Sequence, residues 1–336
     1  MKIRIPFLVI LTVLLVSCEK EEGGIDTFTK SQVNSLLTSA SHSGLIYVDT
    51  DASIQEAVDE LHQKGGGTVV LQKGKHRITE PIRLKSNVNL IGDYNLSRDK
   101  VIITPKSDDY SQPLIEGQNI ENVTLENFKI RGNMTEQEQQ LPGSYHTSRT
   151  AYTTEGIRHN QFGILITGDG EDYDSAVNRN ITIKDLVVRN CTMGIHVKGT
   201  RDLYMSRLKV HKNGLIQGFF HNVYLRRVFK AEVKFSKLYE SLTGNGLNVS
   251  QSSDIKVRKN QAYDNYFRGI RVEGERGYVV NNLNVYKNKC WGNGNYNYRF
   301  VNVNNGRIST NTNVGGSSKI YIRNLNDVKL VSNIDF

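Results

Sequence analysis

One strand template recurs through the middle of the chain and constrains the fold more than any other feature. Its copies begin with a small or polar residue, continue with alternating apolar residues, and occupy residues 163–166, 194–197, 222–225, 246–249 and 269–272. The last four copies begin 28, 24 and 23 residues apart. A period of this size, built from short alternating strands, is typical of a solenoid of stacked coils. A β-propeller would need four strands per blade and a longer period.

A second pattern recurs between these copies. Further apolar-alternating strands are predicted at residues 181–183, 203–205, 255–257 and 283–285. Turns rich in Asn follow at residues 189–190, 212–213, 264–265 and 287–288. Asn tolerates the left-handed backbone conformation and forms side-chain ladders along a stack, so we interpret most of these Asn residues as structural.

The first strands are preceded by a segment with helical periodicity. Ser53, followed three residues later by Glu56, is a capping-box pattern at the start of a helix. The apolar residues of the segment share one helical face: Ile54, Ala57, Val58 and Leu61. We expect this short helix to cover the first coil, whose edge would otherwise expose unpaired backbone groups.

The same region resembles a known superfamily. Residues 54–58 (IQEAV), 65–69 (GGGTV) and 81–90 (PIRLKSNVNL) are similar to the N-terminal segment of pectate-lyase-like and polygalacturonase-like β-helix proteins. The resemblance implies an all-β fold, a single-stranded right-handed parallel β-helix with a short N-terminal capping α-helix. It does not specify the chemistry, because that superfamily includes lyases, hydrolases, epimerases, phage tailspikes and proteins that only bind.

The N-terminus has the pattern of an export signal. Lys2 and Arg4 precede an apolar run at residues 5–16, which is shorter than the ~20 residues of a transmembrane helix. The run ends in Leu-Val-Ser-Cys, which resembles the bacterial lipobox, in which the cysteine, here Cys18, is lipidated. A plain secretory signal with a chance cysteine is the alternative. We predict an exported chain that is lipid-anchored to the outer membrane or cell surface.

Three segments follow from these patterns. We predict a signal peptide at residues 1–17, a flexible tether at 18–43 and one β-helix domain at 44–336. Within the domain, residues 132–160 form a polar insertion that breaks the repeat. An insertion of this length is either functional or disordered. Trp291 is predicted to lie in a loop, where it would stack on a sugar ring or cover a coil edge.

The charge balance bears on the partner. The chain has a formal net charge of +9 at pH 7, which favours an anionic partner unless it only keeps the surface soluble. An exported lipoprotein rarely meets nucleic acid, and no nucleic-acid motif is present. We therefore expect an acidic polysaccharide as partner, membrane contact through the lipid anchor only, no nucleic acid, and a monomer.

Alternation along the repeated strands predicts a column of polar side chains outside the coil. His196, Tyr224, Asn248 and Arg271 would stack on one outer face, since their neighbours fill the interior. Other polar residues fall two positions further along the strands or near the strand starts: Lys198, Arg226, Ser250, Glu273, His221, Asn245 and Arg268. Coils lie ~4.8 Å apart, so this column has the scale of a saccharide groove.

The column favours β-elimination over hydrolysis. Glycoside hydrolysis needs paired carboxylates, and Glu273 is the only carboxylate in the column. Elimination needs a base, cations that neutralise a uronate carboxylate, and an acid for the leaving oxygen. We predict His221, Tyr224 and Arg271 as catalytic residues, with His196 as an alternative base. The predicted substrate-binding residues are His196, Lys198, Arg226, Asn245, Asn248, Arg268 and Glu273.

A polysaccharide lyase acting on a uronate-containing glycan is therefore the predicted function. A glycoside hydrolase or uronate epimerase on the same fold is one alternative, and a non-catalytic glycan-binding or structural β-helix lipoprotein is the other. We predict no metal-binding residues and no cofactor. Ca²⁺ remains an option as a neutralising cation, although no compact Asp/Glu cluster indicates a site for it.

Replacing Cys18 tests the predicted anchor. Cys18→Ser should leave the protein without lipid, because the thiol is the group that is acylated. Membrane fractionation of cells that express either form should find the mutant in the aqueous fraction. If the mutant partitions with membranes as wild type does, the lipobox interpretation is wrong.

Overall fold

A computed structural model describes residues 44–134, 160–215, 220–275, 277–314 and 319–332 of the chain. The predicted signal peptide, the lipidation site Cys18, the tether and residues 135–159 of the predicted insertion lie outside the described residues. No helix among the described residues is long and apolar enough to cross a membrane.

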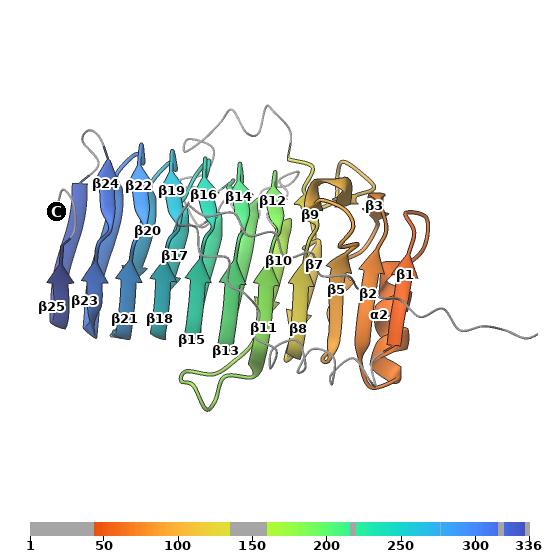
Figure 1. Cartoon of the computed structure of the whole chain (residues 1–336), viewed down its shortest axis with the longest axis horizontal. Helices are drawn as coiled ribbons and strands as arrows, with labels where there is room; N and C mark the ends of the chain where they lie inside the picture. The colour runs from red at the N-terminus through yellow and green to blue at the C-terminus, as the bar shows by residue number, and fades with distance from the viewer. Residues whose placement is uncertain (1–43, 135–159, 216–219, 276, 315–318, 333–336) are drawn as a thin grey trace, which may run out of the picture. The chain divides into compact units, whose positions relative to one another are not determined.

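The described residues form a parallel β-solenoid in which two sheets run along the stack of coils (Figure 1). The large sheet contains β1 (Gly44–Val48), β2 (Gly67–Leu71), β4 (Ile82–Arg83), β5 (Val88–Gly92), β7 (Ile115–Gln118), β8 (Glu121–Glu126), β10 (Phe162–Thr167), β11 (Asn178–Lys184), β13 (Met193–Ser206), β15 (Val223–Lys234), β17 (Leu247–Ser250), β18 (Ser253–Arg258), β20 (Arg268–Glu273), β21 (Val280–Tyr286), β23 (Tyr296–Ser309) and β25 (Lys319–Val331). The small sheet contains β3 (Gly74–Ile78), β6 (Val101–Pro105), β9 (Lys129–Arg131), β12 (Val187–Arg189), β14 (Lys209–His211), β16 (Lys237–Tyr239), β19 (Gln261–Tyr263), β22 (Lys289–Trp291) and β24 (Thr312–Val314). The predicted all-β, right-handed parallel β-helix is confirmed.

The strands of the small sheet are an element that the repeat did not predict. Most of them are three residues long, which is too short for apolar alternation to reveal. Trp291, expected in a loop, ends one of these strands, β22. In the large sheet, the two strands predicted at 194–197 and 203–205 are joined in β13, which pairs with β10 through its first part and with β11 through its last part.

Stacked apolar side chains fill the interior of the coils. Ile195, Val223, Leu247 and Ile270 are partners in consecutive strands, and each is fully buried. Each such residue removes its side chain from water, which contributes roughly 1.5–3 kcal/mol to the free energy of unfolding. The predicted inward register of the repeat is therefore correct.

Buried Asn ladders hold the turns of neighbouring coils together. Asn260 donates its Nδ2 to Oδ1 of Asn288 at 3.0 Å, and Asn288 donates in the same way to Asn311 at 2.9 Å. We expected the Asn residues of these turns to adopt the left-handed conformation, but at most of the turns the residue before the Asn adopts it. Lys287, with φ 55°, adopts it, while Asn288 beside it is buried in the ladder. A side-chain amide satisfies backbone groups inside the turn, which the Lys side chain cannot do.

Helix α2 (Ile54–Gln63) packs against the first coil, and a short 3₁₀ helix, η1 (Arg98–Lys100), lies between two later strands (Figure 1). The Ser53 side chain accepts a hydrogen bond from the backbone N–H of Glu56 at 3.2 Å, so the predicted cap is present. The four apolar residues predicted to share one face are all buried: Ile54, Ala57, Val58 and Leu61. The helix therefore covers the first coil as expected.

A pair of neighbouring substitutions in β21 tests the strand register. Leu283 is fully buried, whereas Asn284 is partly exposed on the opposite face. Leu283→Asp should lower the free energy of unfolding by more than about 4 kcal/mol, because it buries an unpaired charge. Asn284→Asp should change it by less than about 1 kcal/mol. Chemical denaturation measures both, and equal losses would contradict the register, since a one-residue slip exchanges the two faces.

Candidate active site

The strand register assembles the predicted polar column on the outside of the large sheet. His196 is the partner of Tyr224, Tyr224 of Asn248, and Asn248 of Arg271. A parallel column lies two residues further along the same strands: Lys198, Arg226, Ser250 and Glu273. We call these two rows together the site column. All ten predicted site residues other than Cys18 lie in the site column or at the strand starts beside it.

Three aromatic rings meet at one end of the site column. The imidazole of His196 stacks on the Tyr224 ring, with centroids 4.9 Å apart and an interplanar angle of 14°. His221 approaches the same ring edge-on, at 5.4 Å and 87°. The Tyr224 hydroxyl lies 3.1 Å from the hydroxyl of Ser250 in the next coil, close enough for a hydrogen bond. Tyr224 is therefore held on both sides and at its hydroxyl.

His196 is neutral at physiological pH. Burial, together with the cations of Arg226 and Lys198, lowers the pKa of His196 to about 4. Its Nε2 is buried and has no hydrogen-bond partner among the residues that the structure describes. A buried polar atom without a partner is uncommon in folded proteins, and it is frequent at sites that bind a ligand.

His221 is more enclosed than the sequence suggested. We expected it near an outer strand start, but only 3% of its surface is exposed. Its Nδ1 accepts a hydrogen bond from the backbone N–H of Asn245 at 3.1 Å, and its Nε2 lies 2.9 Å from the Asn248 amide. Burial, together with the positive charge of Arg271, holds the pKa of His221 well below its usual value. Both ring nitrogens of His221 therefore face nitrogen atoms of the protein, the backbone N–H of Asn245 and the side-chain amide nitrogen of Asn248.

Several residues that were expected on the solvent side are covered. Asn248 is 4% exposed, Asn245 is 2% exposed and Glu273 is 9% exposed. Asn248 makes hydrogen bonds with His221 and Arg271, and Glu273 accepts hydrogen bonds from Arg299. The Oδ1 atom of Asn245 is buried and has no partner among the described residues.

Arg271 is bound on three sides by protein groups. Its guanidinium donates to Oδ1 of Asn248 at 2.6 Å, pairs with Glu273 at 2.8 Å and also pairs with Glu275. Glu273 in turn receives two hydrogen bonds from Arg299, at 2.7 and 3.1 Å. Glu275 lies beyond the end of β20, outside the repeat positions, so this ion pair could not be predicted from the repeat.

Three other cations, in the site column or beside it, have no buried carboxylate partner among the described residues. Nε of Arg226 donates to the Gln251 side chain at 3.1 Å, and Lys198 lies 3.9 Å from Asp169, which is almost fully exposed. Burial and the charges of Arg271 and Arg299 lower the pKa of Arg268 to about 10, so it remains a cation at neutral pH. Its Nε is buried and has no partner within the described part of the chain.

The described residues contain no group of three or more His, Cys, Asp or Glu side chains that could hold a metal ion. Glu273 and Glu275 are both paired with arginine. The possible use of Ca²⁺ stays a prediction.

Comparison with known proteins assigns the fold to a family. The family model described as "Right handed beta helix region" matches residues 113–296, which is more than half of the chain. The chain belongs to this right-handed β-helix family. The matched range includes β7 to β22 and hence the site column from His196 to Glu273.

Individual relatives are more distant. The chain is 23% identical over 239 residues to the mannuronan C5-epimerase AlgE2 of Azotobacter vinelandii, a match that covers 67% of this chain and 21% of AlgE2. Among solved structures, the A-module of the mannuronan C-5 epimerase AlgE6 from the same organism gives a TM-score of 0.53 at 16% identity, covering 89% of this chain and 94% of the module. The Dettilon tailspike protein gives a TM-score of 0.55 at 14% identity, covering 92% and 64%. The chain thus spans about a fifth of the length of AlgE2, and the solved structures show a common fold.

The ion pairs around Glu273 predict a pH-dependent stability. Burial raises the pKa of this carboxyl, but the hydrogen bond from Arg299 and the charge of Arg271 outweigh burial and lower the pKa below its usual 4.5. Glu273→Gln should lower the free energy of unfolding by about 3 kcal/mol at pH 7, because it leaves Arg299 without its carboxylate partner. A carboxyl whose pKa is lowered on folding stabilises the fold at every pH above its pKa in the unfolded chain. The stabilisation is lost as the pH falls through the pKa in the folded protein. The difference between wild type and mutant, measured by denaturation across pH, should therefore shrink below pH 4.5; a constant difference would contradict it.

Proposed function

We propose that this protein acts on uronate residues of an acidic polysaccharide, removing the proton at C5 and cleaving the chain by β-elimination. The proposal rests on one observation above all: a neutral imidazole, His196, stacks on a phenol, Tyr224, within a row of cations. A base, an acid and neutralising charges are the groups that elimination next to a carboxylate requires. The similarity to mannuronan C5-epimerase AlgE2 supports a uronate as the substrate unit.

His196 is the better candidate for the base. It is neutral above about pH 4, and its Nε2 has no competing partner among the described residues. Both nitrogens of His221, in contrast, face protein groups, which suits a residue that positions Asn248 and the Tyr224 ring. In our proposal His221 therefore moves from the role of base to a positioning role.

Tyr224 is proposed as the acid. When the base takes the C5 proton, the electron pair of the C–H bond forms the C4–C5 double bond and the C4–O4 bond breaks. The Tyr224 hydroxyl gives its proton to the departing O4 oxygen, and Ser250 keeps the hydroxyl in place through their hydrogen bond. The products are a free hydroxyl on one sugar and a 4,5-unsaturated uronate on the other.

The charge that develops on the uronate carboxylate needs cations with spare hydrogen-bond donors. Arg226 and Lys198 are close enough to lower the pKa of His196, and they have no buried carboxylate partner among the described residues. Arg271 is already paired with Glu273 and Glu275, so its role is to hold Asn248. We therefore assign the neutralising role to Arg226 and Lys198 rather than to Arg271, with Arg268 as a further substrate-binding cation.

A uronate C5-epimerase is the second candidate, favoured by the similarity to AlgE2. It shares the first step but returns a proton to C5 from the opposite side of the sugar ring. The proposed base and acid rise from neighbouring strands of one sheet, which favours elimination on one side of the sugar. Incubation of polyuronates with the protein in deuterated water separates the two activities. Unsaturated product, seen by ultraviolet absorbance, indicates a lyase; deuterium at C5 without unsaturation indicates an epimerase; neither product, with or without added Ca²⁺, would refute a catalytic function.

Removing one hydroxyl tests the role of Tyr224. Tyr224→Phe keeps the ring stack but removes the proposed proton donor, so turnover should fall by ~10² to 10⁴ with little loss of stability. Tyr204→Phe is the matched control, because Tyr204 also points outward from β13 but belongs to its second half, away from the site column. Initial rates of unsaturated-product formation, with melting temperatures for both variants, measure the effect. Equal rates for both variants would remove Tyr224 from the mechanism.

A further inference from the structure

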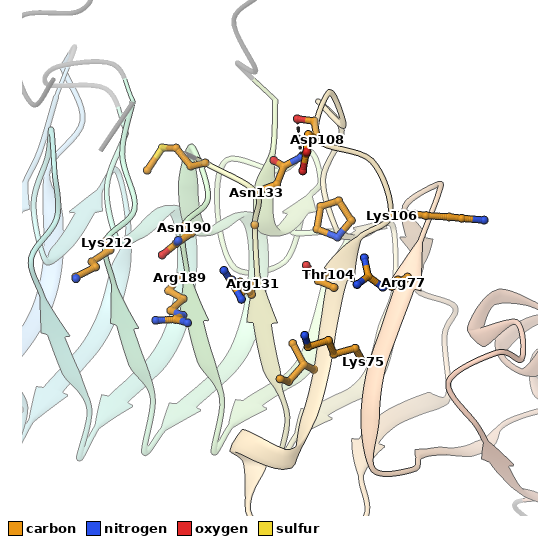
Figure 2. Close-up of a pocket in the computed structure, with 14 residues that line it drawn as sticks. Lys75, Arg77, Thr104, Lys106, Asp108, Arg131, Asn133, Arg189, Asn190 and Lys212 are labelled. Atoms are coloured by element: carbon orange, nitrogen blue, oxygen red, sulfur yellow. Dashed lines mark hydrogen bonds between the residues drawn. The ribbon is translucent and has the colours of Figure 1, made fainter. Parts of the chain in front are cut away.

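A second polar surface lies on the small sheet. A groove of about 540 Å³ crosses β3, β6, β9, β12 and the turn after β14 (Figure 2). Its lining contains six basic side chains: Lys75, Arg77, Lys106, Arg131, Arg189 and Lys212. Among the described residues, Asp108 is the only carboxylate that lines it. None of the six cations forms an ion pair within the described part of the chain.

The strand register concentrates this charge. Arg131 and Arg189 are direct partners in β9 and β12, and Figure 2 shows their guanidinium groups on neighbouring strands of the groove. Like charges on partner positions destabilise a sheet. The Nε atom of Arg189 is also buried without a partner in the described part of the chain. An anion bound between the two arginines would relieve both costs.

The column that contains these arginines continues as a ladder of stacked rings. Arg189 is the partner of His211, and from there His211, Tyr239, Tyr263 and Trp291 follow in consecutive strands. Their ring centroids are 4.6, 4.8 and 4.2 Å apart, and their planes lie within 6° of parallel. Because each ring covers its neighbour, the ladder forms a rigid floor that presents ring edges and polar groups rather than open faces.

A row of lysines borders this ladder. Lys209 is the partner of Lys237, and Lys289 follows two coils later with Gln261 between them. Lys289 lies with its Nζ 5.4 Å from the Trp291 ring. The groove and the lysine row thus form one basic track along the small sheet, which we define as the groove residues plus Lys209, Lys237 and Lys289.

The electrostatic effect of the track is visible at His211. Burial, together with the nearby charges of Arg189, Lys212, Lys129 and Lys209, lowers the pKa of His211 to about 4. Among these cations, Lys129 pairs with Asp99 at 2.7 Å. The cations of the track therefore act together at the position of His211.

We propose that the basic track binds a second stretch of anionic polysaccharide, carboxylated or sulfated, along the axis of the coils and away from the site column. From β9 to β22 the track spans five coil spacings, about 24 Å, so that an extended glycan meets a new polar position every ~4.8 Å. The groove has the volume of a ligand site, and arginine suits planar carboxylate and sulfate groups. The inference does not depend on the chemistry proposed for the site column.

Two other polyanions fit the track less well. Single-stranded nucleic acid binds by stacking bases on open aromatic faces, and here the rings cover one another. An anionic membrane surface is bound by cations together with apolar side chains that insert into the bilayer. Among the exposed large apolar residues of the described chain, only Val314 belongs to the small sheet.

A charge-matched pair of double variants tests the proposal. Arg131→Gln with Arg189→Gln removes two partner charges from the track, and Arg307→Gln with Lys329→Gln removes two partner charges from adjacent strands of the large sheet. Both are made in the Tyr224→Phe background, so that turnover at the site column does not consume the ligand. Affinities for a polyuronate, a sulfated polysaccharide, a neutral glucan, anionic vesicles and an oligonucleotide are measured by calorimetry at two salt concentrations, with melting temperatures for each variant.

The track variant should bind the polyuronate, the sulfated polysaccharide or both about tenfold more weakly than the control, with a smaller dependence on salt. Which anionic glycan responds identifies the acidic group. Equal affinities for the track and control variants would overturn the proposal. The proposal would also be overturned if anionic vesicles or an oligonucleotide bound more tightly than either anionic glycan and the track variant lost that binding. A failure of turnover at the site column leaves this comparison unchanged, so the two proposals fail separately.

Discussion

The coil-to-coil register of the parallel strands determines the rest of this structure. Every residue of a strand is hydrogen-bonded into the same position of the next coil, ~4.8 Å away, so side chains of equivalent positions must stack. Apolar residues gain from this, and the buried row from Ile195 to Ile270 forms the interior. Side-chain amides gain as well, because each Asn of a ladder donates to the next one. Charged residues do not, since equal charges in a column repel.

The two sheets deal with stacked charge in different ways. On the large sheet, Arg271 and Arg299 are direct partners, and Glu273 bonds to both guanidinium groups. This side-chain network fixes Asn248, which lies against His221, so rigidity passes from the arginines to the aromatic end of the site column. On the small sheet, Arg131 and Arg189 are partners with no carboxylate between them among the described residues.

Much of the fold could be predicted because the repeated strand pattern shows which positions of consecutive coils are equivalent. Alternation fixed which side of each strand faces inward, and the capping pattern at Ser53 placed the helix that covers the first coil. The short strands of the small sheet could not be predicted, because three residues contain too little alternation. Left-handed conformations at bulky residues could not be predicted either. Phe235, for example, has φ 53° at a turn position where Gly or Asn is normally favoured. The stack imposes this conformation, which costs about 1–2 kcal/mol at a non-glycine residue.

The site column could be predicted in membership but not in detail, for a physical reason. Position in the repeat places His196, Tyr224 and Arg271 in one row, but it does not tell which of their atoms are already occupied. That depends on residues outside the repeat: Glu275 binds Arg271, and the backbone of Asn245 binds His221. A group whose hydrogen bonds are satisfied within the protein must give them up before it can act on a substrate, and this raises the cost of using it. His196 has a buried nitrogen without a partner among the described residues, so it has no such hydrogen bond to give up. For that reason we assign the chemistry of the column to His196 and Tyr224 rather than to His221 and Arg271.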